Sequence, residues 1–324
     1  MSSGEYTPAR VQAVAQQIIE QVERVIIGKR HVIEQLVTSI LCEGHVLLED
    51  VPGIGKTMLA RSVAASVGGS FNRVQFTPDL LPTDITGSMV FDPRTAEFSY
   101  REGPVVTNVL LADEINRAGP RTQSALLEAM EERHVSVERE RIALPRPFFA
   151  LATQNPVELE GTFPLPEAQL DRFLIRLSIG YPSAEEERDM LQRFREETPL
   201  STIEPVTTPD EMVALTAAIR RVHMHEDIDD YLITLIRRTR EHDLIEVGAS
   251  PRASLALARA AQAHAALHGR DYVLPDDIQG LAVPVLAHRL ILTPHAELTG
   301  RIAADVLAAL VQETPAPVEI TTAV

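Results

Sequence analysis

The sequence lacks tryptophan, is poor in aromatic residues, which make up 4% of the chain, and contains a single cysteine. With few aromatic side chains, its cores must be built from Leu, Ile, Val and Ala. One cysteine cannot form a disulfide within the chain, and the position of Cys42 in an apolar run predicts a buried thiol in a reducing compartment. No stretch approaches the roughly 20 apolar residues of a membrane span, and the N-terminus lacks an apolar signal region. We therefore expect a cytoplasmic protein without direct membrane insertion.

Basic residues are outnumbered, with 30 Lys and Arg against 46 Asp and Glu, which gives a formal net charge of −16. Such a surface repels nucleic acid and anionic membranes unless a local basic groove offsets it. A nucleic-acid partner is therefore disfavoured. A length of 324 residues is enough for one large domain, and fits two of ordinary size better. A content of 45% hydrophobic and 23% charged residues is typical of a soluble globular protein.

Short apolar runs alternate with helical patterns through the first half of the chain. Each run has the length of a buried strand; they are Val46–Leu48, Val74–Phe76, Val109–Leu111, Phe148–Ala152 and Phe173–Leu177. Such alternation predicts an α/β fold in which a parallel sheet is covered by helices on both faces. Two segments interrupt it, at about 77–104 and about 134–145, and both are predicted to be hairpins, the second with a charged tip at Glu138–Arg141.

After Pro182 the strand signals stop and helical patterns take over. Helices are expected at about 183–196, 209–222, 227–242, 251–268, 275–288 and 297–312. We therefore expect an α/β core over 1–182, an all-helical domain over 183–314, and a loose C-terminal tail over 315–324.

The strongest chemical signal is the segment 46–57, where an apolar strand leads into a glycine loop, a Lys-Thr pair and a helix. This order predicts a phosphate loop. Gly53 and Gly55 let backbone N–H groups point at phosphate oxygens, Lys56 places a cation on the β- and γ-phosphates, and the Thr57 hydroxyl is a hard ligand for Mg²⁺. The expected nucleotide-binding set is Asp50, Val51, Pro52, Gly53, Ile54, Gly55, Lys56, Thr57 and Met58.

Position 50 departs from the full phosphate-loop pattern, which has glycine where this chain has Asp50. The position lies at the exit of the strand rather than in the anion cradle, so we expect nucleotide binding to survive. The sequence leaves open whether the charge of Asp50 weakens that binding.

A second apolar strand, over 108–112, ends in Asp113 and Glu114. Open α/β sheets place their ligands at the C-terminal ends of strands. Asp113 is expected to hold Mg²⁺, mainly through its water, and Glu114 to orient and deprotonate the attacking water. Together with the phosphate loop, this pair predicts an enzyme that hydrolyses ATP to ADP and phosphate.

Five strings carry a family resemblance: Gly-Ile-Gly-Lys-Thr from 53, Leu-Leu-Ala-Asp-Glu-Ile-Asn-Arg-Ala from 110, Ala-Thr-Gln-Asn-Pro from 152, Pro-Glu-Ala-Gln-Leu-Asp-Arg-Phe from 166 and Ser-Pro-Arg-Ala from 250. In this order they resemble the MoxR family of AAA+ ATPases over about residues 10–310. The resemblance implies an αβα core with a five-stranded parallel sheet, a helical lid, and a ring, commonly hexameric, whose subunits share nucleotide sites. It also implies that 77–104 is the helix-2 insert and 134–145 the hairpin before sensor 1.

The resemblance implies further roles for single residues. Asn155 would be sensor 1, near the γ-phosphate or the attacking water. Arg172 would be the arginine finger that reaches the next subunit's site, with Arg117 a second candidate for that role. Arg252 would be sensor 2, coupling the position of the lid to the nucleotide state. The segment Ile27-Gly28 resembles the one that lines the adenine pocket, and the alternative, that Gly28 is a simple helix stop, is nearly as well supported.

By resemblance, the biological role is chaperone-like: remodelling of a protein client, or loading of its metal cofactor, often with a partner that carries a von Willebrand factor A domain. Two alternatives are a nucleic-acid-associated motor and a nucleotide-gated scaffold with little turnover. The acidic composition argues against the motor, and the intact pair Asp113 and Glu114 argues against the scaffold.

Overall fold

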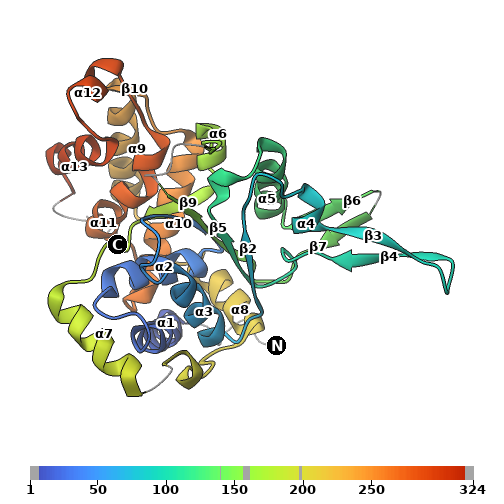
Figure 1. The fold of residues 1–324 in the computed structure, drawn as a ribbon. Helices are drawn as coiled ribbons and strands as arrows, with labels where there is room; N and C mark the ends of the chain where they lie inside the picture. The colour runs from blue at the N-terminus through green and yellow to red at the C-terminus, as the bar shows by residue number, and fades with distance from the viewer. Residues whose placement is uncertain (1–6, 139, 156–160, 197–198, 318–324) are drawn as a thin grey trace.

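Five parallel strands form the central sheet of the chain (Figure 1). The structure is a computed structural model that describes residues 7–138, 140–155, 161–196 and 199–317. Across the sheet the strands are β2 (Phe71–Gln75), β5 (Val109–Asp113), β8 (Phe149–Gln154), β1 (His45–Glu49) and β9 (Phe173–Leu177), and every neighbouring pair is parallel. The predicted parallel α/β sheet is thus confirmed. β2 differs most from its predicted range: it begins at Phe71, before the run Val74–Phe76, and as an edge strand it buries only Val74.

Helices cover both faces of the sheet, and the strand residues alternate between them. Val46 and Leu48 of β1 pack with apolar residues of α1 (Pro8–Glu23), α2 (Arg30–Leu41) and α3 (Lys56–Ser66). Leu47, between them, packs with α4 (Pro82–Thr86) and α5 (Pro120–Glu132) on the other face. Burial on both faces explains why the strands read as continuous apolar runs rather than alternating ones.

Two antiparallel hairpins extend from the α4–α5 side of the sheet, away from the C-terminal helices (Figure 1). The longer is β3 (Gly87–Asp92) with β4 (Glu97–Glu102), and the shorter is β6 (His134–Val137) with β7 (Glu140–Ala143). They lie within the segments 77–104 and 134–145. Residue 139, in the turn of the shorter hairpin, lies outside the described residues.

The C-terminal half is helical, with one addition. Its helices are α7 (Ala184–Glu196), α8 (Pro209–Ile219), α9 (Glu226–Glu241), α10 (Pro251–Leu267), α11 (Pro275–Leu286), α12 (Pro294–Leu298) and α13 (Ala303–Glu313), with 3-10 turns η2 (Pro199–Thr202) and η3 (Ala287–Arg289). The expectation of an all-helical region is wrong in one respect, because β10 (Ile245–Val247) pairs with β11 (Ile291–Leu292). Strands of three and two residues are too short to show a period in sequence.

A second correction concerns the last predicted helix, at about 297–312, which is two helices. Gly300, with φ of 75°, separates α12 from α13. A left-handed residue ends a helix because it turns the chain out of the helical path. Within the described ranges, no helix combines the length and the apolar character needed to cross a membrane.

The C-terminal helices are joined to the sheet by a shared core. Helices α1 and α2 pack against α8 and α10, and α11 packs against the edge strand β9. Buried residues of all these elements form one continuous apolar cluster. The N-terminal helices therefore connect the two halves of the molecule.

Candidate functional site

The segment between β1 and α3 forms a tight loop that ends at the N-terminus of α3. Gly53 and Gly55 have φ of 86° and 93°, in the left-handed region that favours glycine. A Cβ on Gly53 would meet no atom within 4 Å, so this glycine is required by its backbone conformation rather than by lack of space. The loop thus turns back on itself, and α3 begins at Lys56, where the positive end of the helix dipole lies.

Lys56 lies at the centre of this loop. Its Nζ donates a hydrogen bond of 2.6 Å to the backbone oxygen of Asp50. Partial burial lowers the pKa of Lys56, against the opposing attraction of Asp50, Asp113 and Glu114. The ammonium group of Lys56 is therefore held among acidic side chains. An anion that binds here together with cations would complete the balance of charge.

Asp113 ends strand β5, and side chains from the two neighbouring strands fix its carboxylate. Thr153 of β8 donates to Oδ1 at 2.6 Å, and Arg73 of β2 contacts Oδ2 at 2.7 Å. The Thr153 hydroxyl oxygen also accepts from the backbone N–H of Glu114 at 2.8 Å. Three strands thus meet at one carboxylate at the C-terminal edge of the sheet.

Glu114 follows with φ of 59°, so its side chain leaves the direction of the strand. Gln75 of β2 donates from Nε2 to Glu114 Oε2 at 2.7 Å, and Arg117 Nε lies 3.0 Å from the same oxygen. Arg117 comes from the 3-10 turn η1 (Ile115–Arg117) that follows. It therefore lies beside Glu114 of its own chain.

Lys56, Asp113 and Glu114 line one cavity of about 260 Å³. Its walls come from the glycine loop, from the start of α3 and from the ends of β2, β5 and β8: Pro52, Gly53, Gly55, Lys56, Thr57, Met58, Arg73, Gln75, Asp113, Glu114 and Asn155. Asn155 is only 5% exposed, at the end of β8. The cavity brings together five residues that the sequence predicts for catalysis, for metal binding or as the cation of the loop. They are Lys56, Thr57, Asp113, Glu114 and Asn155.

A second, mainly apolar cavity of about 420 Å³ adjoins the first, because Pro52, Gly53, Gly55 and Met58 line both. Its other walls are Val25–Ile27, the stretch Ile179–Pro182, and Met190 and Phe194 of α7. Ile27 and Lys29 line this cavity, while Gly28 between them lies against Glu186, whose side chain a Cβ at that position would overlap. Of the residues Ile27–Lys29, Gly28 alone does not line this cavity.

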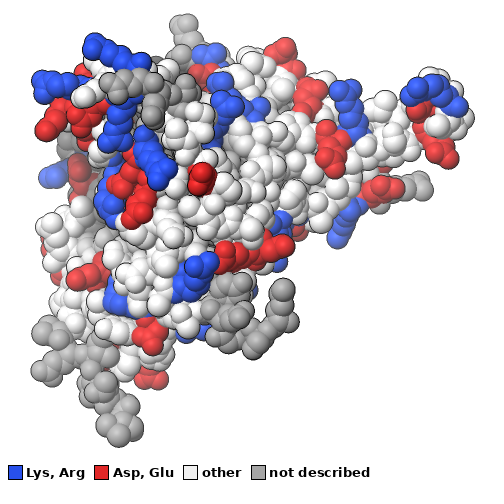
Figure 2. Space-filling view, turned by 90° about the horizontal axis from the view of Figure 1, so that it is seen from below, with Lys and Arg blue, Asp and Glu red and all other residues white. Residues whose placement is uncertain are grey.

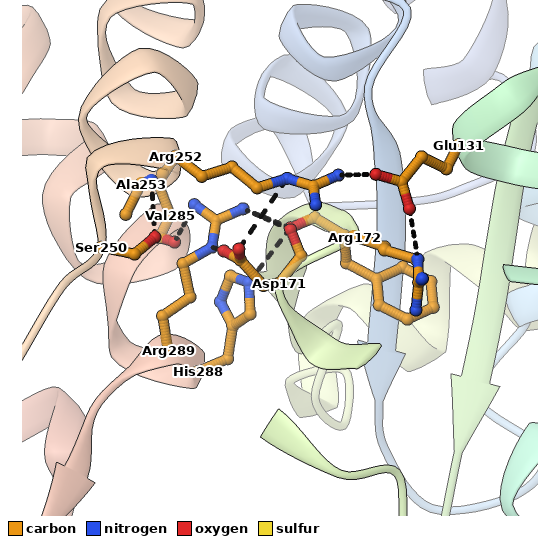
Figure 3. Close-up of polar contacts among 10 residues, drawn as sticks. Glu131, Asp171, Arg172, Ser250, Arg252, Ala253, Val285, His288 and Arg289 are labelled. Carbon is orange, nitrogen blue, oxygen red and sulfur yellow. Dashed lines mark hydrogen bonds and ion pairs between the residues drawn. The ribbon is translucent and has the colours of Figure 1, made fainter. Parts of the chain in front are cut away.

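Arg172 and Arg252 lie together in a different place (Figure 3). Arg172 Nε is 2.7 Å from Glu131 Oε2, and Arg252 Nη2 is 3.2 Å from Glu131 Oε1. One carboxylate from α5 thus bridges an arginine that follows α6 (Glu167–Leu170) and an arginine at the start of α10. The hydrogen bond from Arg172 is the main reason why the pKa of Glu131 is lowered.

Asp171 extends this cluster toward the buried Arg289, whose Nε lies 2.8 Å from Asp171 Oδ1. Burial lowers the pKa of Arg289 to about 10, against the attraction of Asp171. The cluster borders a cavity of about 320 Å³, and among the described residues none lines both this cavity and the one around Lys56. Arg172 and Arg252 therefore do not reach the phosphate loop of their own chain.

Sequence reasoning missed Arg73, Gln75 and Thr153, which hold the two carboxylates. The available signal was the spacing of Arg73 and Gln75, two residues apart and so on one face of a strand. This spacing indicates a contact with the site only when β2 is known to lie beside β5. The sequences of strands do not give their order in a sheet.

Comparison with known proteins adds an independent observation. Residues 45–175 match the ATPase family associated with various cellular activities (AAA), and residues 237–310 match the AAA lid domain. Chaperone MoxR1 of Mycobacterium tuberculosis is 43% identical over 92% of this chain and 81% of its own length. Protein MoxR of Paracoccus denitrificans is 35% identical over 84% and 87%. A crystal structure from Cytophaga hutchinsonii, described as a candidate ATPase, is 36% identical with a TM-score of 0.88, over 95% of this chain and 96% of that one.

Proposed function

This chain belongs to the MoxR family of AAA+ ATPases, and from that premise we propose that it binds ATP with Mg²⁺ in the cavity around Lys56 and hydrolyses it. The observation that supports the proposal is the convergence of Lys56, Thr57, Asp113 and Glu114 on one cavity from two separate segments. The adjoining apolar cavity offers a place for the adenine ring beside the phosphate loop.

Each residue has a role that follows from its chemistry. The loop N–H groups and Lys56 bind the phosphates, and the hydroxyl of Thr57 and the carboxylate of Asp113 are the hard oxygen ligands that suit Mg²⁺. The metal, when bound, neutralises charge on the phosphate oxygens. Glu114 accepts a proton from the attacking water, and Gln75 orients its carboxylate. Asn155, at the end of β8, faces the same cavity as a polar sensor of the γ-phosphate.

We infer that catalysis also needs a second subunit. Arg172 and Arg252 lie in a cavity apart from their own phosphate loop, which supports a role across an interface in a ring, commonly hexameric in this family. Arg172 would act as the arginine finger on the γ-phosphate of the neighbour. Arg252 starts α10 in the C-terminal half and contacts Glu131 in the α/β half, so it is suited to link the two halves to nucleotide state.

The work that hydrolysis drives is proposed to be chaperone-like remodelling, or metal-cofactor loading, of a protein client in the cytoplasm. The name of the relative Chaperone MoxR1 supports this, and a partner with a von Willebrand factor A domain is part of the proposal. Figure 2 shows basic and acidic side chains interspersed around a broad uncharged area, so the described residues of this face form no basic stripe of the kind a nucleic-acid motor needs.

Two substitutions test the hydrolytic site. Lys56→Ala should abolish ATP binding in isothermal titration, because it removes the cation that faces the phosphates. Glu114→Gln should still bind ATP while turnover falls by roughly 10²–10⁴-fold, the usual contribution of a positioned general base. Glu128→Gln, at an exposed position on α5, is the matched control and should behave as wild type. Near-normal affinity in Lys56→Ala, or lost affinity in Glu114→Gln, would contradict the assignment.

A further inference from the structure

Asp50 occupies the position where the full phosphate-loop pattern has glycine, and its carboxylate is buried rather than directed at solvent. It accepts three hydrogen bonds from the exit of strand β9. Ser178 Oγ donates to Oδ1 at 2.8 Å, the backbone N–H of Ile179 donates to Oδ2 at 2.6 Å, and that of Gly180 donates to Oδ1 at 3.2 Å. Both carboxylate oxygens are thus used to hold one stretch of chain.

The backbone of Asp50 makes two more connections. Its N–H donates to the oxygen of Gln154, at the end of β8, and its carbonyl oxygen accepts from Lys56 Nζ at 2.6 Å. The residue therefore links the exits of β1, β8 and β9 to the lysine of the phosphate loop. A residue with so many bonds, through both its side chain and its backbone, fixes the relative positions of the segments that it joins.

The segment held by Asp50 forms one side of the apolar cavity. Ile179 and Gly180 line it, and the chain continues through Tyr181 and Pro182 to α7. The opposite side is formed by the phosphate loop itself, from Pro52 to Gly55. Asp50 directly precedes the loop, and its carboxylate binds the exit of β9, so this residue joins the two sides of the cavity.

We propose that Asp50 is a positioning residue for the base of the bound nucleotide: its carboxylate fastens the exit of β9 to the phosphate loop and thereby sets the shape of the base cavity. This rests on the proposed function, in which ATP binds at that loop. It also answers a question that the sequence leaves open. If Asp50 acted only as a charge, it would repel the phosphates, and removing it would tighten the binding of every phosphate ligand. If it holds the base cavity, removing it weakens only ligands that carry a base.

The experiment compares two ligands by isothermal titration with Mg²⁺: ATP, and inorganic tripolyphosphate, which has the phosphates without the base. The variants are Asp50→Gly, which completes the phosphate-loop pattern, and Asp50→Asn, which keeps the size but presents an amide N–H₂ to N–H donors. Glu49→Gln is the control, because it removes a neighbouring charge that pairs with Arg176 instead. We expect Asp50→Gly to weaken ATP binding roughly ten- to a hundredfold, with tripolyphosphate binding unchanged or tighter. Asp50→Asn should lie between this variant and wild type.

Steady-state kinetics give a second readout. The KM for ATP should rise more than kcat falls, because Asp113 ends β5 and Glu114 directly follows it, and none of the three bonds that Asp50 makes through its carboxylate reaches that strand. Should Asp50→Gly fail to fold, Asp50→Asn and Ser178→Ala, which removes one donor of three, carry the test.

The outcomes separate this inference from the function on which it rests. Equal weakening of ATP and tripolyphosphate, or tightening of both, would overturn the role of Asp50 while leaving the nucleotide site intact. A wild-type protein that binds neither ligand would instead refute the proposed function.

Discussion

Replacing Arg172 by alanine distinguishes a catalytic role from a structural one, because the two roles predict losses of ATP hydrolysis of very different size. The Arg172 side chain is 29% exposed and its contact with Glu131, itself 35% exposed, spans 2.7 Å. Ion pairs with this exposure contribute about 0.2–1 kcal/mol, since solvent screens them. If Arg172 were only structural, its loss would cost the fold no more than about 1 kcal/mol and would leave ATP hydrolysis nearly unchanged.

An arginine finger predicts a much larger effect on rate. Loss of such a residue lowers turnover by roughly 10³-fold or more, which corresponds to about 4 kcal/mol of transition-state stabilisation. Glu131→Gln is the matched control, because it weakens the same contact while keeping the arginine. We expect Arg172→Ala to bind ATP normally and to lose most hydrolysis, and Glu131→Gln to keep turnover within a few-fold of wild type. Similar turnover in the two variants would refute the assignment.

Mixing two inactive variants tests whether the site is shared. Lys56→Ala subunits keep Arg172, and Arg172→Ala subunits keep an intact nucleotide cavity. Mixed rings should therefore regain activity wherever a Lys56→Ala subunit lies next to an Arg172→Ala subunit. For the wild type, hydrolysis should rise more steeply than linearly with protein concentration as rings assemble. If gel filtration shows mixed oligomers and no activity returns, Arg172 is not the shared residue, and Arg117 is tested in the same way.

Two further predictions concern stability and the shorter hairpin. Asp277 is buried; although burial alone raises its pKa, hydrogen bonds from Arg270 and His264 lower the pKa to about 2, against an ordinary 3.8. A lowered pKa stabilises the fold above about pH 4, and this contribution, at most about 2 kcal/mol, is lost as pH falls toward 2. In urea unfolding, Asp277→Asn should therefore be less stable than wild type at pH 7, with the difference smaller by about 1 kcal/mol at pH 3; an equal difference at both values would contradict this. Replacing the hairpin tip Glu138–Arg141 by Gly and Ser should leave basal hydrolysis within a few-fold, because the described residues of the tip lie outside the cavity around Lys56, and a variant that no longer assembles would show the hairpin to be architectural.

The parts of the site that sequence could predict are those encoded in contiguous residues. Gly53, Gly55, Lys56 and Thr57 are neighbours whose conformation is set locally, so their pattern alone places them at a helix N-terminus. The contact between Gln75 and Glu114 could not be predicted, because it depends on which strand lies beside β5.

The direction of a single side chain is harder still to predict. Asp50 stands in the phosphate-loop segment, and its charge suggested an effect on phosphate binding. Its carboxylate instead contacts Ser178, Ile179 and Gly180, more than 120 residues later in the chain. Likewise, the sequence implies separate roles for Arg172 and Arg252, and only the fold shows that Glu131 contacts both.

The apolar cluster that runs from α1 and α2 into α10 and α11 has a consequence for cooperativity. Ile18 and Leu36 belong to the same cluster as Leu257 and Leu281, so the two halves of the chain share this core, whereas the core on the α4–α5 face lies within residues 47–173. A fragment limited to 45–175 would expose the apolar surface that these helices cover, and the separated C-terminal helices would expose the other side of it. We therefore expect the two halves to unfold together, so that the boundary near residue 182 marks a change of secondary structure rather than of stability.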